Sequence, residues 1–334
     1  RSTPSNSSAA SDVYKRQVQQ KLEAGLPYTV RLKVPLEGET SFTDVVRGPI
    51  SVSNAQIEDS IMLKSDGYPT YHLANVVDDH LMKLSHVVRA EEWISSTPKH
   101  VLLYQAFGWE MPSFVHMPLL RNRDRSKISK RRDPTSLLWY REQGFLPEAL
   151  RNFLALMGWS IGGDREIFSL EEMIEHFTWD RVKTSGPVFD LQKLEWMNGE
   201  YVRRMSAREL LERILRQPYT RHVDEPADRL LKITALIQER IQRLSQFDEM
   251  TNFFFEREPY EADDLGPKKH DADFARRALA ACRQIIEATE PWTAEALEAA
   301  MRELAEANGW KRSPLYMVLR VAVTSRRVGT PLFE

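Results

Sequence analysis

The stretch that decides the fold is residues 71–120, YHLANVVDDHLMKLSHVVRAEEWISSTPKHVLLYQAFGWEMPSFVHMPLL. An apolar segment ends at Asp78 and Asp79, which we interpret as neighbours in a strand. Their side chains would then point to opposite faces and could not clamp a metal ion together. A short β-like run follows at residues 86–88. A helical pattern then covers residues 97–107, and another short strand is predicted near residues 117–120. Because strands that alternate with helical segments are typical of a parallel α/β sheet, this stretch predicts one.

The residues upstream predict a small β-rich unit and a tail. Apolar side chains alternate over residues 28–34, and they recur over residues 45–52 between turns marked by glycine and proline. Residues 1–17 are rich in serine and alanine and show no periodicity, so we expect a disordered tail there that is not native to the protein.

Downstream of residue 136 the pattern becomes helical. Ser206 followed by Glu209 is a capping-box signature, and Ser169 followed by Glu172 is another. Residues 294–307 are rich in strong helix formers. Five apolar residues recur at helical spacing and predict one helix face: Leu230, Ile233, Ile237, Ile241 and Leu244. The C-terminal part is therefore predicted to be a helical bundle, with a polar break at residues 261–269 between two subdomains.

Composition excludes several classes of protein. A formal net charge of −2 gives no overall basic signal, so any nucleic-acid contact must come from local basic faces. The single cysteine, Cys282, excludes an internal disulfide and a thiolate zinc cluster, and we assign no metal ligand. No apolar run reaches the roughly 18 residues that span a bilayer, and no leader pattern opens the sequence. We therefore expect a soluble, cytoplasmic protein with no membrane contact.

A K-x-S-K pattern occupies residues 127–130, in a loop after a predicted strand. Two lysines and a hydroxyl are suited to hold a polyphosphate. Adenylation moves negative charge onto the departing pyrophosphate, so cations beside the β- and γ-phosphates stabilise the transition state more than the ground state. Taken alone, the pattern is weak, because a basic loop is usually only a solvated surface.

Three segments in register resemble bacterial-type glutamyl-tRNA synthetase, a class I aminoacyl-tRNA synthetase. They are residues 65–79 (SDGYPTYHLANVVDD), residues 88–100 (VRAEEWISSTPKH) and the K-x-S-K loop. Residues 144–150 (GFLPEAL) and 186–190 (GPVFD) extend the resemblance, which runs from about residue 26 to the end of the chain. It implies ATP-dependent activation of L-glutamate to glutamyl-adenylate and transfer to the 3′ end of tRNA(Glu), with Mg²⁺ accompanying ATP and no zinc in this chain.

The resemblance also implies a fold and a domain order. It implies a partial Rossmann-like class I catalytic domain with a small β-rich insertion, followed by α-helical stem-contact and anticodon-binding domains. The expected parts are a tail (1–17), part of the acceptor-binding insertion (18–70), the second half of the Rossmann domain (71–124), the K-x-S-K loop with the stem-contact domain (125–205), and two anticodon-binding subdomains (206–264 and 265–334, the second truncated).

Three residues match family positions that meet the side-chain carboxylate of glutamate: Tyr71, Asn75 and Arg89. A planar guanidinium offers paired donors to a carboxylate, and a phenol adds one directional hydrogen bond. Without the resemblance, Arg89 fits a structural ion pair with Glu91 or Glu92, and Asn75 fits an ordinary polar residue.

The resemblance places ATP against Glu92, which would accept hydrogen bonds from ribose, the backbone of Leu120, and the loop. The loop residues expected to bind ATP are Lys127, Ile128, Ser129, Lys130 and Arg131. Lys130 is the main candidate for stabilising phosphate charge in the transition state. Lys127 supports it, Ser129 orders the loop, and these three are the expected catalytic residues.

The helical half is expected to bind tRNA. The candidate contacts are Arg203, Arg204, Arg208, Arg213, Arg216, Arg240 and Arg243, because arginine suits phosphates and base edges. Each of them also fits a solvated helix face. The aromatic run at residues 253–255 fits base stacking or core packing.

The H-x-G-H motif of class I synthetases is not in this sequence, so we expect this chain alone to be inactive. The family resemblance implies a monomer. One alternative is a non-catalytic tRNA-binding module. Others are a glutaminyl-tRNA synthetase, a shortened relative that modifies a tRNA base, and a generic nucleotide-binding enzyme. The helical C-terminal half argues against two of these alternatives. A glutaminyl enzyme would be expected to have β-barrels in this region, and the shortened relative would be expected to lack the region.

Overall fold

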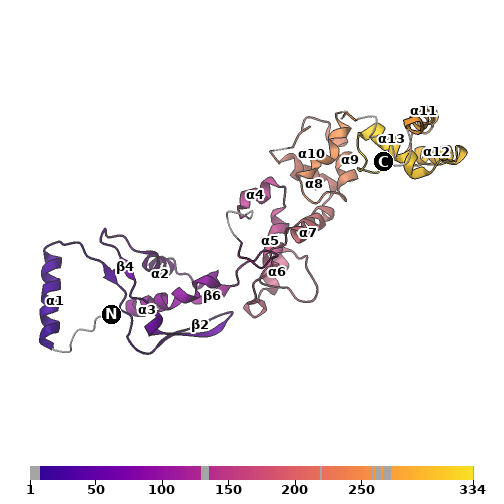
Figure 1. Cartoon of the computed structure of the whole chain (residues 1–334). Coiled ribbons are helices and arrows are strands. Elements are labelled where there is room, and N and C mark those ends of the chain that lie inside the picture. The colour runs from indigo at the N-terminus through magenta and orange to yellow at the C-terminus, as the bar shows by residue number, and fades with distance from the viewer. Residues whose placement is uncertain are drawn as a thin grey trace. The chain divides into compact units, whose positions relative to one another are not determined.

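Figure 1 shows the computed structural model of the chain. The structure describes residues 8–128, 135–218, 220–256, 259–260, 265 and 272–333. The chain divides into two compact units. Unit 1 comprises residues 1–127, 155–166 and 171–189, and unit 2 comprises residues 128–154, 167–170 and 190–334.

Unit 1 combines helices with two small sheets. In chain order its elements are α1 (Ser8–Glu23), β1 (Val30–Arg31), β2 (Glu39–Asp44), β3 (Gly48–Ser53), η1 (Asn54–Gln56), β4 (Ile61–Leu63), α2 (Tyr71–Leu81), β5 (His86–Ala90), η2 (Glu91–Ser96), α3 (Thr97–Phe107), β6 (Ser113–Met117) and η3 (Trp179–Arg181). Helix α6 (Leu170–His176) starts at the boundary of the unit.

The main sheet of unit 1 has the strand order β3-β2-β6-β5. Strands β2, β6 and β5 run parallel, and β3 closes a hairpin against β2 in antiparallel register. The predicted parallel α/β sheet is therefore present with an antiparallel edge strand. The β-rich unit upstream supplies two of its strands, so residues 39–53 do not form a separate body.

Local sequence explains why these elements form. Burial alternates strictly along β2, with Thr40, Phe42 and Asp44 buried, as expected for a strand with one face on a core. Helix α3 has Pro98 in its first turn and ends at Gly108, whose φ of 68° is the left-handed conformation that glycine adopts most easily. This helix has the predicted bounds.

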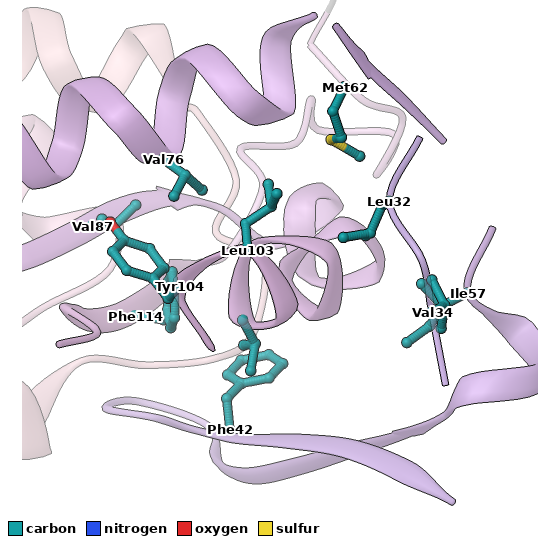
Figure 2. Packing of buried hydrophobic residues seen from close by; sticks show 11 residues of the cluster. Leu32, Val34, Phe42, Ile57, Met62, Val76, Val87, Leu103, Tyr104 and Phe114 are labelled. Atoms are coloured by element: carbon teal, nitrogen blue, oxygen red, sulfur yellow. The ribbon is translucent and has the colours of Figure 1, made fainter. Parts of the chain in front are cut away.

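A buried apolar cluster holds the sheet and its helices together (Figure 2). Val87 and Phe114 come from the parallel strands, Val76 from α2 and Tyr104 from α3, and each is at most 9% exposed. Phe42 of the hairpin meets Phe114 edge to face at 5.7 Å between ring centroids. This packing fixes β5 and β6, and with them the residues described below.

Three expectations for unit 1 were wrong in detail. The apolar segment before the paired aspartates is helix α2, whereas its aspartates were interpreted as strand neighbours pointing to opposite faces. The second strand covers residues 113–117 instead of 117–120. Helix α1 covers residues 8–23, so residues 8–17 are helical and not the disordered tail that was expected.

Unit 2 is helical in the part that the structure describes. Its elements are α4 (Leu137–Glu142), α5 (Pro147–Leu156, which begins in this unit), α7 (Leu191–Arg204), α8 (Ala207–Leu215), α9 (Ala227–Ile237), α10 (Gln246–Thr251), η4 (Asn252–Phe254), α11 (Ala272–Ala288), α12 (Ala294–Ala307) and α13 (Arg312–Thr324). One buried cluster lies among the helices up to α10, and a second lies among α11, α12 and α13.

Most helix predictions for unit 2 are confirmed. The Ser206 hydroxyl caps α8 by accepting a hydrogen bond from the Glu209 amide at 3.2 Å, and α12 has the predicted bounds. The five apolar residues between Leu230 and Leu244 are all buried, but α9 ends at Ile237, so they do not lie on one helix. The predicted polar break falls almost entirely outside the described residues. No helix in the described part is both long and apolar enough to cross a membrane.

Candidate active site

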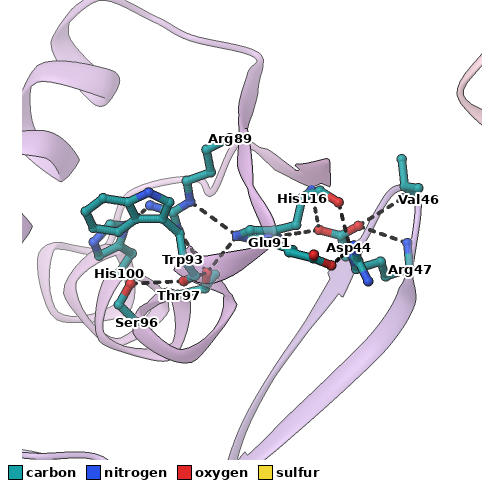
Figure 3. A network of polar contacts seen from close by, with 10 residues as sticks. All are labelled: Asp44, Val46, Arg47, Arg89, Glu91, Trp93, Ser96, Thr97, His100 and His116. Atoms are coloured by element: carbon teal, nitrogen blue, oxygen red, sulfur yellow. Dashed lines mark hydrogen bonds and ion pairs between the residues drawn. The ribbon is translucent and has the colours of Figure 1, made fainter. Parts of the chain in front are cut away.

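Two parallel strands place Arg89 beside His116. Arg89 of β5 pairs in register with His116 of β6, and its Nε donates a hydrogen bond to the His116 Nε2 at 3.2 Å (Figure 3). The Nη1 of Arg89 lies 3.3 Å from Nδ1 of His100, and its Nη2 donates to the Thr97 hydroxyl at 2.8 Å. Both partners belong to α3 and are at most 1% exposed.

A carboxylate holds the far side of the His116 ring. Oδ2 of Asp44 lies 2.6 Å from Nδ1 of His116, and both side chains are fully buried. The other carboxylate oxygen accepts hydrogen bonds from the amides of Val46 and Arg47, at 3.0 Å and 2.9 Å, in the turn after β2. We call the set formed by Asp44, Arg89, Thr97, His100 and His116 the Arg89 network.

Tyr71 lies next to the guanidinium of Arg89. The rings of Tyr71 and Trp93 are 5.0 Å apart, and the Cζ of Arg89 lies 5.9 Å from the Trp93 ring. Asn75 follows Tyr71 by one helical turn, so the two side chains share a face of α2. Its Oδ1 is buried and has no hydrogen-bond partner among the residues described. A buried acceptor without a donor is costly, which favours a ligand that supplies one.

The ion-pair alternative for Arg89 is wrong. Glu91 pairs with Arg47, at 2.6 Å between Oε2 and Nη2, and Glu92 pairs with Lys127 at 2.5 Å. Within the described part of the chain, no carboxylate lies within 4 Å of the Arg89 guanidinium. Burial lowers the pKa of Arg89, and interactions with Tyr71 and Asp79 oppose that effect. A half-buried guanidinium without an anionic partner is suited to receive one from a substrate.

The remaining ATP candidates are located only in part. Leu120 and Ile128 are half-buried, and Lys127 and Glu92 are partly exposed beside each other. Ser129, Lys130 and Arg131 lie outside the described residues. Gly186, in one of the segments that carry the resemblance, packs tightly under the strand end: a Cβ there would lie 2.9 Å from the carbonyl oxygen of Leu119. Glycine is therefore required at this position for the backbone around Leu120 to keep its course.

Comparisons with known proteins identify the family of both parts of the chain. Residues 2–196 match the family model for tRNA synthetases class I (E and Q), catalytic domain, and residues 206–334 match an anticodon binding domain. A glutamate–tRNA ligase of Thermus thermophilus is 46% identical over 329 residues, which cover 97% of this chain and 69% of that protein. One from Acidothermus cellulolyticus is 48% identical over 318 residues, which cover 91% and 62%.

The chain belongs to the glutamate–tRNA ligase family. A solved structure of a glutamate tRNA ligase from Elizabethkingia meningosepticum, in complex with its amino acid, matches with a TM-score of 0.82 and 31% identity. It covers 96% of this chain, and this chain covers 67% of it. The chain thus spans about two thirds of the length of these relatives. The partial Rossmann-like fold and the helical anticodon-binding part predicted from sequence are confirmed.

The arginines proposed to contact tRNA fall into two groups. Arg203 pairs with Glu200, Arg213 with Glu148 and Glu209, and Arg243 lies 3.6 Å from Glu195. The other four are exposed, and no acidic partner within 4 Å is found for them in the described part of unit 2: Arg204, Arg208, Arg216 and Arg240. These four are the better candidates for binding phosphate.

The aromatic run at residues 253–255 is neither fully buried nor freely exposed. Phe255 packs against the first helical core and stacks on His222, with ring centroids 4.2 Å apart. Phe253 and Phe254 are also 4.2 Å apart and half-buried. No group of three or more potential metal-ligating side chains gathers among the residues that the structure describes.

Sequence reasoning missed most of the Arg89 network. Asp44, Thr97, His100 and His116 come from three elements up to 72 residues apart, and only the fold brings them together. A histidine inside the apolar run before Met117 was the one available signal, because a buried imidazole needs a partner. With the strand predicted too late in the sequence, His116 fell outside it.

The buried histidines make unit 1 sensitive to acid. Burial lowers the pKa of His100 from 6.5 to about 3, so its ring is neutral in the folded protein, whereas an unfolded histidine binds a proton near pH 6.5. Between these values the unfolded state binds more protons, and the free energy of unfolding falls as the pH is lowered. The loss is about 1.4 kcal/mol per pH unit below 6.5, or about 2 kcal/mol by pH 5.

We therefore expect His100→Asn to lose less stability than the parent chain between pH 7.5 and pH 5, by about 2 kcal/mol. Urea titration with pulse-labelling hydrogen exchange of the β6 amides would measure this for unit 1 alone. The control is His176→Asn, which changes an exposed histidine and should keep the parental pH dependence. Equal losses in the parent and in His100→Asn would contradict the assignment.

Proposed function

We propose that this chain carries the glutamate-selecting and part of the ATP-binding machinery of an enzyme that attaches L-glutamate to tRNA(Glu). In the first step the α-carboxylate of glutamate attacks the α-phosphate of ATP, which gives glutamyl-adenylate and releases pyrophosphate. In the second step a hydroxyl at the 3′ end of the tRNA attacks the adenylate carbonyl and releases AMP. The observation that carries the proposal is the half-buried Arg89 guanidinium, which has no anionic partner in the described part.

Arg89, Tyr71 and Asn75 are assigned to the side chain of glutamate. The guanidinium supplies charge and directed donors, and the Tyr71 phenol lies beside it. Glutamine has a neutral amide with its own N–H donors, and these would face the N–H donors of arginine. Because donors repel donors and the amide lacks the negative charge, this arrangement favours the acid over its amide.

Glu92, the Leu120 backbone and the loop residues 127–131 are assigned to ATP. Glu92 and Lys127 form an ion pair with each other in the structure. Both side chains are about half exposed, so the pair is weak and either partner can turn to a ligand at small cost. Mg²⁺ is expected to arrive bound to the phosphates of ATP, and we propose no resident metal ligand.

The proposal is tested by ATP–pyrophosphate exchange with tRNA present, using glutamate or glutamine as the amino acid. The protein to use is a chimera, here called the completed protein. It joins this chain to the segments of the Thermus thermophilus protein that the chain does not cover, so that it reaches the full length of that protein. Exchange with glutamate and little or none with glutamine supports the proposal. Equal exchange with both amino acids would overturn the assignment of Arg89.

The same assay on this chain alone addresses a separate prediction. We expect no exchange, because its sequence does not contain the H-x-G-H motif. Turnover near that of the completed protein would contradict this. An inactive completed protein that still binds tRNA would support the alternative of a non-catalytic tRNA-binding module.

Binding of tRNA by the helical half should depend strongly on salt. Each lysine or arginine that neutralises a phosphate releases counterions and steepens the dependence of log K on log salt by about 1. We expect replacement of the four exposed arginines by glutamine (R204Q, R208Q, R216Q and R240Q together) to weaken tRNA binding and flatten that slope by roughly 2 to 4. Filter binding at several salt concentrations measures both effects.

A charge-matched control replaces four arginines that already face carboxylates: R276Q, R283Q, R302Q and R312Q. These substitutions remove the same formal charge and should change the slope much less. An equal change in both variants would show that only net charge matters. Absence of tRNA binding by this chain at low salt would remove the prediction altogether.

We also propose that the protein acts as a monomer in the cytoplasm. Ribosomes use charged tRNA in that compartment, and a single buried cysteine suits its reducing conditions.

A further inference from the structure

The donors of Arg89 fix which nitrogen of each neighbouring imidazole carries a proton. A guanidinium offers only N–H donors, so any imidazole nitrogen within hydrogen-bond distance of it must be an acceptor. Nε2 of His116 and Nδ1 of His100 are both in that position. The proton of His116 therefore resides on Nδ1, and that of His100 resides on Nε2.

Each of these protons has a partner of its own. Nδ1 of His116 donates to Asp44 at 2.6 Å, and Nε2 of His100 donates to Nδ1 of His72 at 3.0 Å. The two imidazoles thus present lone pairs to Arg89 and direct their protons away from it. Thr97 accepts from Arg89 and has the Trp93 carbonyl oxygen within 3.0 Å for its own proton.

The carboxylates around the network are occupied elsewhere or lie further away. Asp44 reaches Arg89 only through the His116 ring, and Glu91 and Glu92 have their own cations. Asp79 attracts Arg89 electrostatically, but the two do not form an ion pair within 4 Å. Arg89 is therefore held in a defined position by three hydrogen bonds whose acceptors bear no charge.

We propose that His116 and His100 are positioning residues that fix the Arg89 guanidinium through neutral acceptors, so that its positive charge is left for the carboxylate of the amino-acid substrate. A carboxylate in either place would hold the guanidinium equally well but would neutralise it, and glutamate would lose its advantage over glutamine. The two histidines thus orient the Arg89 guanidinium without neutralising its charge. This inference rests on the proposed function, which assigns the side chain of glutamate to Arg89.

The first test needs no activity and uses this chain as it stands. Long-range ¹H–¹⁵N correlation spectra of ring nitrogens distinguish the two neutral tautomers and the imidazolium. At pH 7 we expect His116 as the Nδ1–H tautomer and His100 as the Nε2–H tautomer. The opposite tautomer at His116, or an imidazolium at either position, would overturn the inference.

The second test separates orientation of Arg89 from general support of the fold. Glutamine at position 116 places an amide oxygen near the former Nε2 and keeps an acceptor for Arg89, whereas asparagine places its amide near the former Nδ1 and keeps only the partner of Asp44. In the completed protein, we expect His116→Asn to lower the ratio of kcat/KM for glutamate over glutamine by about 10- to 100-fold. In His116→Gln the ratio should stay within about three-fold of the parent, even if both rates fall.

A purely structural role for His116 predicts equal ratios in the two variants, since each keeps one of two hydrogen bonds. If His116→Asn does not fold, the tautomer spectra still decide. The proposed function fails separately: if substitution of Arg89 itself leaves the ratio unchanged, Arg89 does not select glutamate. If Arg89 substitution lowers the ratio and His116→Asn does not, only the present inference is wrong.

Discussion

Arg89→Lys is expected to lower kcat/KM for glutamate by about 100-fold or more in the completed protein, because two charge-assisted hydrogen bonds to a carboxylate contribute about 1.5–3 kcal/mol each. Lysine keeps the charge but loses the planar fork, and its ammonium cannot donate to His116, His100 and Thr97 while also facing a substrate. Pyrophosphate exchange at varied glutamate concentration measures the effect, which should appear mainly in KM.

The matched control for this prediction is Arg31→Lys, which changes an exposed arginine of β1 in the same unit. It should leave both kinetic parameters near the parental values. Glutamine provides a second comparison, because kcat/KM for this poor substrate should change far less than that for glutamate. A loss of the same size for both amino acids would mean that Arg89→Lys damages the fold and not the selection of glutamate.

Lys130→Ala is expected to lower kcat for pyrophosphate exchange by about 100- to 1000-fold, the usual cost of removing one group that stabilises developing charge. The change should leave KM for glutamate nearly constant, because the lysine is assigned to phosphates whose charge grows in the transition state. Lys127→Ala should cost less, since Glu92 already shares the charge of that side chain.

Lys33→Ala is the control for the two loop variants, since it removes an exposed lysine of unit 1. If Lys130→Ala raises KM for ATP without changing kcat, the lysine binds the ground state and the transition state equally, which contradicts its assigned role. If Lys127→Ala has the larger effect, the order of the two lysines must be reversed.

The parts of the fold that could be predicted from sequence are those whose ends are marked by neighbouring residues. Helix α3 was predicted with its correct bounds because a proline in its first turn and a glycine at its end determine both ends. Helix α2 has no side-chain cap hydrogen bond at its N-terminus, and its aspartates near the end gave a pattern that fitted a strand equally well. The membership of β2 in the main sheet depends on a pairing with β6 some 70 residues later, which no local pattern reports.

The candidate site followed from sequence only where a motif marked it. Tyr71 and Arg89 lie in segments that carry the family resemblance, and the structure brings them together. Among the described residues, Arg89 keeps an unpaired positive charge because the nearby groups pair in a particular way. Glu91 forms an ion pair with Arg47, and the Arg89 guanidinium donates hydrogen bonds to histidines instead. Sequence alone allowed the opposite pairing, because proximity along the chain favours Glu91 and Glu92 over residues of distant strands.

Asp44 joins a tight turn to an imidazole with one carboxylate. Any rearrangement of the β2–β3 hairpin would therefore shift the His116 ring, although the hairpin tip holds no residue assigned to substrate. In a library of random variants selected for charging with a non-cognate amino acid, changes in this turn should be recovered together with changes in the pocket itself. Remodelling the hairpin would then be a practical route for engineers who want to alter which amino acid is accepted while leaving Arg89 unchanged.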